Sequence, residues 1–362
     1  MAKIKQIKLS NFRNFSNFET TLDEKLNIFF GDNGSGKTNI LESISLIAKG
    51  RGIRNSNLPN LIKNKQRFFF IKKILELNKN DFNIEIYSEK SDEKYKKIIK
   101  INDDLSKESL DHLNQSISFL IFMPEMERLF QLTPSYRRNF LDRLIFSERN
   151  DYNKIINKYK KYLIERIKIL QIQRQDDDWL SQIEVEICKI GLEIYRLRST
   201  QLYYINKNIK QMNYLNEFKF KVQLEIKDEY YKSNLTFDNY LSDLKNSRPF
   251  DRQYGRTKIG PHRSDFFACI DDDYEASLLS TGQQKTLVLM ILLAKCNYLI
   301  NEKNITPILL LDEIASHLDS NNRKILLDMI NSFDIQFFLT GTDKNLFSFV
   351  STKALFYNIT NI

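Results

Sequence analysis

The residues best suited to chemistry are the eight from Gly31 to Thr38, which fit the phosphate-binding pattern G-x-x-x-x-G-K-[ST]. Glycines allow backbone N–H groups to turn around the β- and γ-phosphates of a nucleotide, and a following helix adds its positive N-terminal end. Lys37 adds a point charge, and Thr38 supplies a hydroxyl ligand for Mg²⁺. We expect nucleotide binding by the loop and the residue after it, namely Gly31, Asp32, Asn33, Gly34, Ser35, Gly36, Lys37, Thr38 and Asn39.

The context of this loop separates a binding site from a simple glycine-rich turn. Leu26 to Phe30 is a short apolar run typical of a buried strand, and residues 39–49 carry apolar side chains at roughly helical spacing. The phosphate-binding pattern requires this order of strand, loop and helix. The sequence therefore favours the site over the turn.

A second set of chemical groups follows the apolar residues 308–311. This run predicts a buried parallel strand, and ligands in α/β proteins bind at the carboxyl ends of such strands. Asp312 is positioned to hold Mg²⁺, usually through water, and Glu313 to act with Lys37 in catalysis as the base that polarises the attacking water. Acid pairs that end strands are often only caps, but the phosphate-binding loop favours the catalytic interpretation.

Between these two halves of the site the hydrophobic pattern changes. Residues 68–77, 82–87 and 97–101 predict an antiparallel β-meander, and from Pro134 onward apolar residues recur at helical spacing. Two helices of about forty residues, separated at residues 176–178, would form an antiparallel hairpin about 60 Å long. Alternating residues from Phe218 to Ile226 then predict a strand.

We therefore predict an α/β fold with a mixed sheet and an antiparallel β-meander, interrupted by a helical insertion. Residues 1–130 and 250–362 together would form one discontinuous ATPase head. Residues 131–249 would form the inserted helical domain that contains the hairpin.

The composition narrows the classes of partner. The 55 Lys and Arg against 46 Asp and Glu give a net charge of +9, which favours nucleic acid or an anionic surface over a generally basic protein without such a partner. Three well-separated cysteines suggest neither a disulfide framework nor a zinc site. The N-terminus lacks an apolar signal segment, and the longest apolar run, Leu287 to Ala294, is too short to cross a bilayer. We expect a cytoplasmic protein with no membrane partner.

A third element, Ser280-Thr281-Gly282-Gln283, opens an apolar helix and resembles the signature motif of ABC-type ATPases. Residues 315–319 resemble the D-loop of these ATPases, and Asp319 ends it. The resemblance implies that the nucleotide is ATP and that the signature of one subunit closes over the γ-phosphate held by another. Ser280, Gly282 and Gln283 would then complete the site in trans, where a hydroxyl, a glycine backbone and a helix N-terminus suit an anion. ATP would thus drive formation of a homodimer.

Over its whole length the chain resembles the RecF family of bacterial recombination mediators, whose heads are similar to those of SMC proteins. The resemblance rests on residues 9–15, 31–39, 134–142, 260–265, 280–283 and 311–313. It implies ATP-dependent dimerisation on duplex DNA near gaps, and help in loading the RecA recombinase with accessory proteins of the RecO and RecR type. Thr281 and Pro124-Glu125 depart from the patterns of transporters, and no histidine stands at the transporter switch position.

Two other functions share these motifs. A nucleotide-binding subunit of a membrane transporter normally has the histidine switch and a shorter insertion, and an SMC-like structural tether needs far longer helices. Both differences favour the DNA-repair ATPase.

The sequence offers two basic clusters for contact with DNA phosphates, one near the phosphate-binding loop and one on the first long helix. They comprise Lys49, Arg51, Arg54, Lys63, Lys65 and Arg67 near the loop, and Lys154, Lys158, Lys160, Lys161, Arg166 and Lys168 on the helix. Arg137, Arg138, His262 and Arg263 are further candidates for function, to which the sequence assigns no role.

Overall fold

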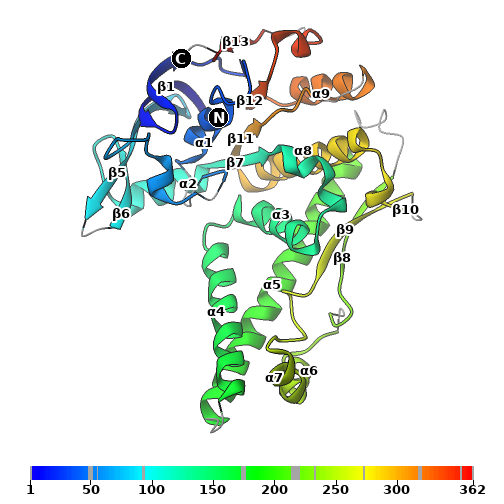
Figure 1. Ribbon diagram of the computed structural model, residues 1–362. Helices are drawn as coiled ribbons and strands as arrows, with labels where there is room; N and C mark the ends of the chain where they lie inside the picture. The colour runs from blue at the N-terminus through cyan, green and yellow to red at the C-terminus, as the bar shows by residue number, and fades with distance from the viewer. Residues whose placement is uncertain are drawn as a thin grey trace. The chain divides into compact units, whose positions relative to one another are not determined.

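The computed structural model describes residues 2–47, 52–54, 56–91, 94–172, 177–212, 221–231, 234–271, 274–316, 320–350 and 353–360. The chain forms two compact units (Figure 1). The head unit comprises Met1–Arg128, Gln211–Lys219 and Ser280–Ile362, and the helical unit comprises Leu129–Lys210 and Phe220–Leu279. The sequence assigned residues 250–279 to the head, whereas here they belong to the helical unit. The reason is strand pairing, because β9 (Asp265–Ile270) lies antiparallel to β8 (Val222–Lys227).

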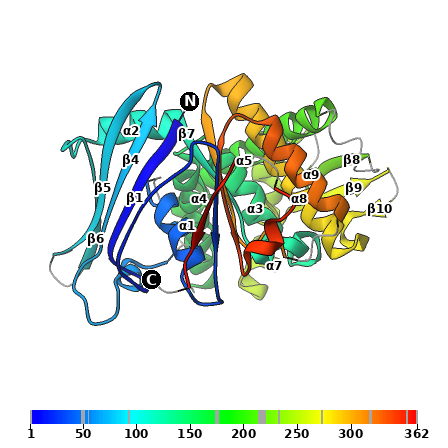
Figure 2. The ribbon, with the colours of Figure 1, turned by 90° about the horizontal axis from the view of Figure 1, so that it is seen from above.

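The centre of the head unit is a parallel sheet in the order β13-β3-β12-β11-β7. Its middle strands are almost entirely buried, as expected for a sheet covered on both faces. Figure 2 shows α1 and an antiparallel sheet on one side, and α8 and α9 on the other. The bounds are β3 Leu26–Phe30, β7 Ile117–Phe122, β11 Thr306–Leu311, β12 Gln336–Gly341, β13 Leu355–Asn358, α1 Lys37–Ser45, α8 Thr281–Lys303 and α9 Ser320–Ser332.

The second sheet of the head unit is the expected meander, extended by the two N-terminal strands into the order β2-β1-β4-β5-β6. Lys73 of β4 is fully buried and donates to the carbonyls of Ser43 and Ile44 in the last turn of α1. A lysine suits this position because the C-terminal end of a helix carries unpaired carbonyls and partial negative charge. The meander therefore holds the far end of α1. The remaining bounds are β1 Ala2–Phe12, β2 Phe15–Thr21, β4 Phe70–Leu77, β5 Asn80–Ser91, β6 Lys94–Ile101 and α2 Lys107–Ser116.

The helical unit corrects the prediction of a first helix of about forty residues. That segment is two helices, α3 (Pro134–Phe146) and α4 (Tyr152–Gln171), and the break between them carries Arg149, which pairs with Asp151 and Glu193. The second long helix is α5 (Asp177–Gln211), and with α4 it forms the antiparallel hairpin. Because α4 has 20 residues, the paired part is about 30 Å long, half the expected length.

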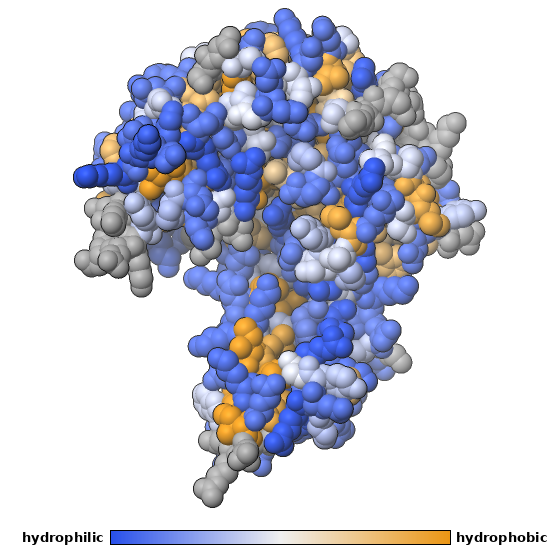
Figure 3. Space-filling model, in the orientation of Figure 1, coloured by the Kyte–Doolittle hydropathy of each residue, from blue (hydrophilic) through white to orange (hydrophobic). Residues whose placement is uncertain are grey.

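The other elements of this unit are α6 (Phe237–Asn246), α7 (Arg248–Tyr254), β8, β9 and β10 (Tyr274–Glu275). Phe218 and Phe220, from the predicted strand, lie outside the described residues. Exposed apolar side chains include Ile164, Ile172 and Trp179 of the hairpin, and Figure 3 shows apolar patches over α4 within the mostly hydrophilic surface of the helical unit. None of the described helices is both long enough and apolar enough to cross a membrane.

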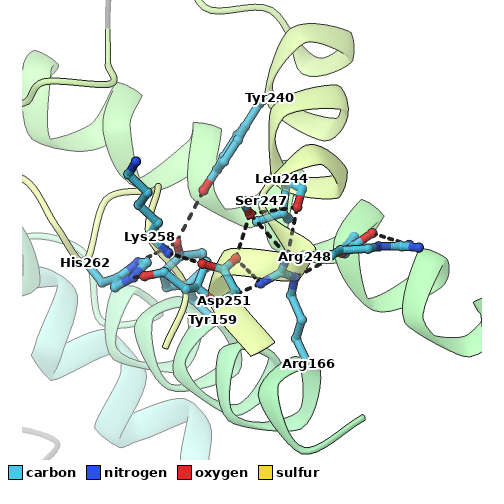
Figure 4. A network of polar contacts seen from close by, with 11 residues as sticks. Tyr159, Arg166, Tyr240, Leu244, Ser247, Arg248, Asp251, Lys258 and His262 are labelled. Atoms are coloured by element: carbon cyan, nitrogen blue, oxygen red, sulfur yellow. Dashed lines mark hydrogen bonds and ion pairs between the residues drawn. The ribbon is translucent and has the colours of Figure 1, made fainter. Parts of the chain in front are cut away.

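A buried ionic network joins α4, α5 and α7 inside the helical unit (Figure 4). Arg166 has no exposed surface and donates to Glu184 (3.0 Å), Asp251 (2.6 Å), Thr257 Oγ1 (3.1 Å) and the carbonyl of Leu244 (2.8 Å). A buried guanidinium is tolerated when its donors are paired in this way. The assignment of Arg166 to a DNA-binding surface is therefore wrong.

His262 extends this network to Tyr159 of α4. Its Nε2 lies 3.0 Å from the carbonyl of Thr257, which can only accept, so Nε2 carries the proton and Nδ1 accepts from Tyr159 Oη at 3.0 Å. Burial lowers the pKa of His262 to about 4, so the imidazole is neutral at neutral pH. A side chain at Gly260, where φ is +125°, would place Cβ 2.3 Å from Tyr159 Oη and 2.4 Å from Tyr240 Oη. This turn therefore requires glycine.

The neutral state of His262 predicts a loss of stability in mild acid. Between pH 7 and pH 5 the unfolded chain protonates this histidine near its ordinary pKa of 6.5 while the folded chain does not, which lowers the free energy of unfolding by about 2 kcal/mol. His262→Gln removes the titration, so its stability should depend less on pH over this range. Urea unfolding at pH 7, 6 and 5, followed by fluorescence of the single tryptophan, Trp179 of the helical unit, measures the difference. Equal pH dependence in the two proteins would contradict the assignment.

Candidate nucleotide-binding site

The glycine-rich loop has the backbone that its sequence predicts. Gly31, Gly34 and Gly36 all have positive φ, at +146°, +85° and +111°. At Gly36 a Cβ would also lie 2.6 Å from the side-chain amide of Asn14, so both strain and contact exclude larger residues. Gly36 is the N-cap of α1 and provides no side-chain cap, so the first N–H groups of the helix remain available to an anion.

Asn14, in the turn between β1 and β2, stabilises this loop through side-chain hydrogen bonds. Its Nδ2 donates to the carbonyl of Ser35 (2.7 Å), and its Oδ1 accepts from Asn39 Nδ2 (2.8 Å). The neighbouring Arg13 donates to both carboxylate oxygens of Glu42 on α1, at 2.8 and 2.9 Å. The sequence places this turn in the segment 9–15, which carries part of the family resemblance, but gives it no role. The structure shows that it fixes both the loop and the helix behind it.

Lys37 is buried, and its ammonium donates to the carbonyls of Gly31 (2.7 Å) and Asp32 (2.9 Å). Two of its three donors are thus used by the loop itself, and the third is available to a phosphate oxygen. Asp32, Asn33 and Gly34 at the tip are exposed, which leaves room for a ligand over the loop.

The carboxylate of Asp312 is buried, with an exposed fraction of 2% for the residue. Its Oδ2 accepts from Thr38 Oγ1 (2.7 Å), and its Oδ1 accepts from Thr340 Oγ1 (2.6 Å). A hydroxyl and a carboxylate oxygen side by side match the ligands that Mg²⁺ takes from proteins when nucleotide phosphates complete its shell. The two residues chosen from the sequence for the metal are therefore adjacent and suit the ion.

Thr340, the fifth residue of β12, is one of the functional residues that sequence reasoning missed. Besides its bond to Asp312, its hydroxyl accepts from the backbone N–H of Glu313 at 2.8 Å. The signal that marks it is a polar residue after the apolar residues 337–339, the same signal that marked Asp312 after residues 308–311. Glu313 itself is partly exposed and has a left-handed backbone with φ of +48°.

The signature residues open α8 with a reciprocal cap. Ser280 is the N-cap, its Oγ accepts from the N–H of Gln283 (3.3 Å), and Gln283 Oε1 accepts from the N–H of Ser280 (3.0 Å). Because the Ser280 hydroxyl accepts in this cap, its own proton is free to donate outward. A Cβ at Gly282 would lie 3.3 Å from Asn322 of α9. Asp319 lies outside the described residues.

Arg137 and Arg138, to which the sequence assigned no role, connect residues 134–142 with residues 260–265 within the helical unit. Arg137 donates to both carboxylate oxygens of Asp265, at 2.8 and 2.6 Å, and Arg138 donates to the carbonyl of Ser264 at 2.6 Å. Arg137 and His262 thus hold the fold, while the side chain of Arg263 is exposed.

The structure also sorts the candidates for DNA contact. Lys63 is used internally, since it donates to the carbonyl of Asn14 (3.0 Å) and to Ser16 Oγ, and Lys158 pairs with Glu186 at 3.0 Å. Lys49 and Arg51 lie outside the described residues. The candidates with exposed side chains and none of these contacts are Lys65, Arg67, Lys154, Lys160, Lys161 and Lys168.

Comparison with known proteins agrees with this geometry. Residues 3–119 and 135–360 match the family model described as the RecF/RecN/SMC N terminal domain. The DNA replication and repair protein RecF of Rickettsia typhi is 33% identical over 369 residues, which cover 96% of each chain. The same protein of Rickettsia prowazekii is 34% identical over 354 residues, again with 96% of each chain covered.

Solved structures give the same result. A structure of the recombination mediator protein RecF with ATPrS superposes with a TM-score of 0.81 at 28% identity, covering 95% of this chain and 94% of the other. The RecF structure with ATP gives a TM-score of 0.79 at 28% identity, covering 95% and 92%. An Smc head bound to a ScpA domain, 15% identical with a TM-score of 0.54 and coverage of 96% and 91%, shares the fold. The predicted α/β ATPase head with a helical insertion is thus confirmed, and the chain belongs to the RecF family of DNA replication and repair proteins.

Proposed function

We propose that this chain is an ATP-dependent DNA-binding ATPase of recombinational repair and replication restart. ATP binding with Mg²⁺ closes a homodimer on duplex DNA near gaps, and hydrolysis reopens it. The closed dimer helps to load the RecA recombinase, acting with accessory partners of the RecO and RecR type in the bacterial cytoplasm. The observation that carries the proposal is the contact of Thr38 with Asp312, which joins the phosphate-binding loop to the catalytic strand.

Each residue of the site has a distinct role in this proposal. Thr38 and Asp312 hold Mg²⁺, which neutralises the charge of the β- and γ-phosphates. Lys37 and the N–H groups of residues 31–39 bind the same phosphates from the other side. Glu313 orients and polarises the attacking water, which requires a carboxylate that the metal does not occupy.

The proposal that the signature binds the nucleotide of the partner subunit is supported by the helix cap at Ser280. The N-terminus of the 23-residue helix α8 and the outward hydroxyl proton of Ser280 form an anion site. The RecF structures with ATP and ATPrS support the view that the anion is a nucleotide phosphate. Among the alternatives, family membership counts against a transporter subunit, and the 20 and 35 residues of α4 and α5 are too short for a long tether.

The first test removes the lysine of the loop. Lys37→Met deletes a charge-assisted contact in a site shielded from water, so affinity for ATP should fall by about 100-fold while the fold is kept. Titration with a fluorescent ATP analogue measures the affinity, and Lys107→Met, at an exposed position of α2, is the matched control. Wild-type affinity in a folded Lys37→Met protein would rule out the nucleotide site.

The second test separates binding from dimerisation. Ser280→Arg places a large side chain where a small hydroxyl must face the partner's γ-phosphate, so monomers should still bind ATP but no longer dimerise or hydrolyse it. Light scattering with and without ATP measures the mass, and Ser332→Arg adds the same side chain to an exposed position of α9 as a control. Equal loss of ATP binding and dimerisation would place Ser280 in the site of its own subunit.

The third test connects ATP to DNA. Glu313→Gln keeps the length and hydrogen bonding of the base without its charge, so hydrolysis should slow by about 10²-fold while the ATP-bound dimer accumulates. With ATP this variant should bind duplex DNA more tightly than the wild type, and without nucleotide it should bind equally. Fluorescence anisotropy of a short duplex at several salt concentrations measures the affinity.

The slope of that salt dependence reports how many DNA phosphates the protein neutralises. A slope near −0.9 per phosphate predicts a fall in affinity of roughly 10³- to 10⁵-fold between 50 and 200 mM salt for about six to ten phosphates. The double variant Lys160→Gln, Lys161→Gln should make the slope shallower by about 0.9 for each phosphate that it no longer neutralises. DNA binding that ignores ATP and keeps one slope in every variant would exclude a DNA site built by dimerisation.

A further inference from the structure

Lys285 lies in the first turns of α8, five residues after Ser280, and only 1% of it is exposed. Its ammonium donates to Glu127 Oε1 (2.6 Å), to the carbonyl of Ser316 (2.8 Å) and to the carbonyl of Glu313 (3.3 Å). An ammonium has three N–H donors, and here three acceptors surround it. One side chain of the signature helix is therefore bound to the loop that carries the proposed catalytic base.

The backbone of Glu313 depends on such hydrogen bonds. Its φ of +48° is left-handed, a conformation that L-residues other than glycine adopt at a cost in free energy and keep only where their surroundings hold them. The N–H of Glu313 donates to Thr340 Oγ1 (2.8 Å), and its carbonyl accepts from Ser316 Oγ (2.6 Å) and Lys285. The side chain of Ser316 belongs to the same short loop, whereas Lys285 comes from a different element and fixes the loop to it.

A purely structural ion pair with Glu127 is the competing explanation. Burial lowers the pKa of Lys285, and the carboxylate of Glu127 opposes this effect. A buried ion pair of this kind adds little net stability over an apolar pair of the same size. An apolar pair, however, could not donate to the two backbone carbonyls of the catalytic loop.

We propose that Lys285 is a positioning residue for ATP hydrolysis. It holds Glu313 in the left-handed conformation that presents the catalytic carboxylate, and it ties that conformation to the helix whose N-terminus carries Ser280. If a nucleotide phosphate bound by the partner subunit moves the signature helix, Lys285 moves with it and shifts the catalytic loop to which it is hydrogen-bonded. The inference rests on the proposed function, since it assumes hydrolysis by Glu313 and a trans contact at Ser280.

The test uses two variants, because Lys285→Met alone leaves the partly buried Glu127 unpaired. The double variant Glu127→Gln, Lys285→Met removes that charge and should recover the thermal stability that the single variant lacks. In both variants we expect kcat for ATP to fall at least about tenfold, with ATP affinity and ATP-driven dimerisation unchanged. Recovery of kcat together with stability would show that the lysine is only structural and would overturn the proposal.

A double-mutant cycle tests whether Lys285 acts through Glu313. Added to Glu313→Gln, the change Lys285→Met should lower kcat little further, because the base that it positions is already inactive. Fully additive effects on kcat would show independent action and would overturn the inference. Failure of the proposed function itself would appear elsewhere, as wild-type protein that does not hydrolyse ATP or does not dimerise with it.

Discussion

The structure of the site depends on the carboxylate of Asp312 and the two hydroxyls that donate to it. Thr38 lies 274 residues before Asp312 in the chain, and Thr340 lies 28 residues after it. A buried carboxylate is costly unless its oxygens are paired, so both hydroxyls must reach it. They do so because β12 lies between β3 and β11 in the sheet, and Thr340 is its last residue but one. The order of the strands is thus a chemical requirement of the site, although the helical unit separates β3 from β11 in the chain.

The parts of the fold that the sequence predicted are those specified by local pattern. The strand predicted at residues 26–30 is β3 as observed, and the acidic strand, the meander and the helix after the signature also form where expected. The missed residues act over long distances instead. Asn14, Thr340 and Lys285 each pair with a segment far away in the chain. A polar residue after an apolar run marks the position of Thr340, but no local pattern identifies the partner of any of the three.

Two errors have different physical causes. The break between α3 and α4 contains neither proline nor glycine, so helical periodicity runs through it without a visible stop. Arg166 is the opposite case, because its spacing in the sequence predicts that it is buried. It follows Tyr159 by seven residues and precedes Ile169 by three, which places it on the buried stripe of α4. A charged residue on a core stripe indicates a buried pair more strongly than a surface contact.

The cations that are paired internally also explain how the net charge of +9 bears on DNA. Arg166, Arg13 and Arg137 are paired with carboxylates of their own unit, which leaves the total charge of the chain unchanged. Each such pair balances one positive group with at least one negative group, so the excess of positive charge remains on the other residues. That excess acts at long range on a polyanion, whereas the paired groups act only on their neighbours. Arginine and lysine therefore have two separate roles in this chain. Those paired with carboxylates inside a unit stabilise the fold, and those with exposed, unpaired side chains are available to bind phosphate.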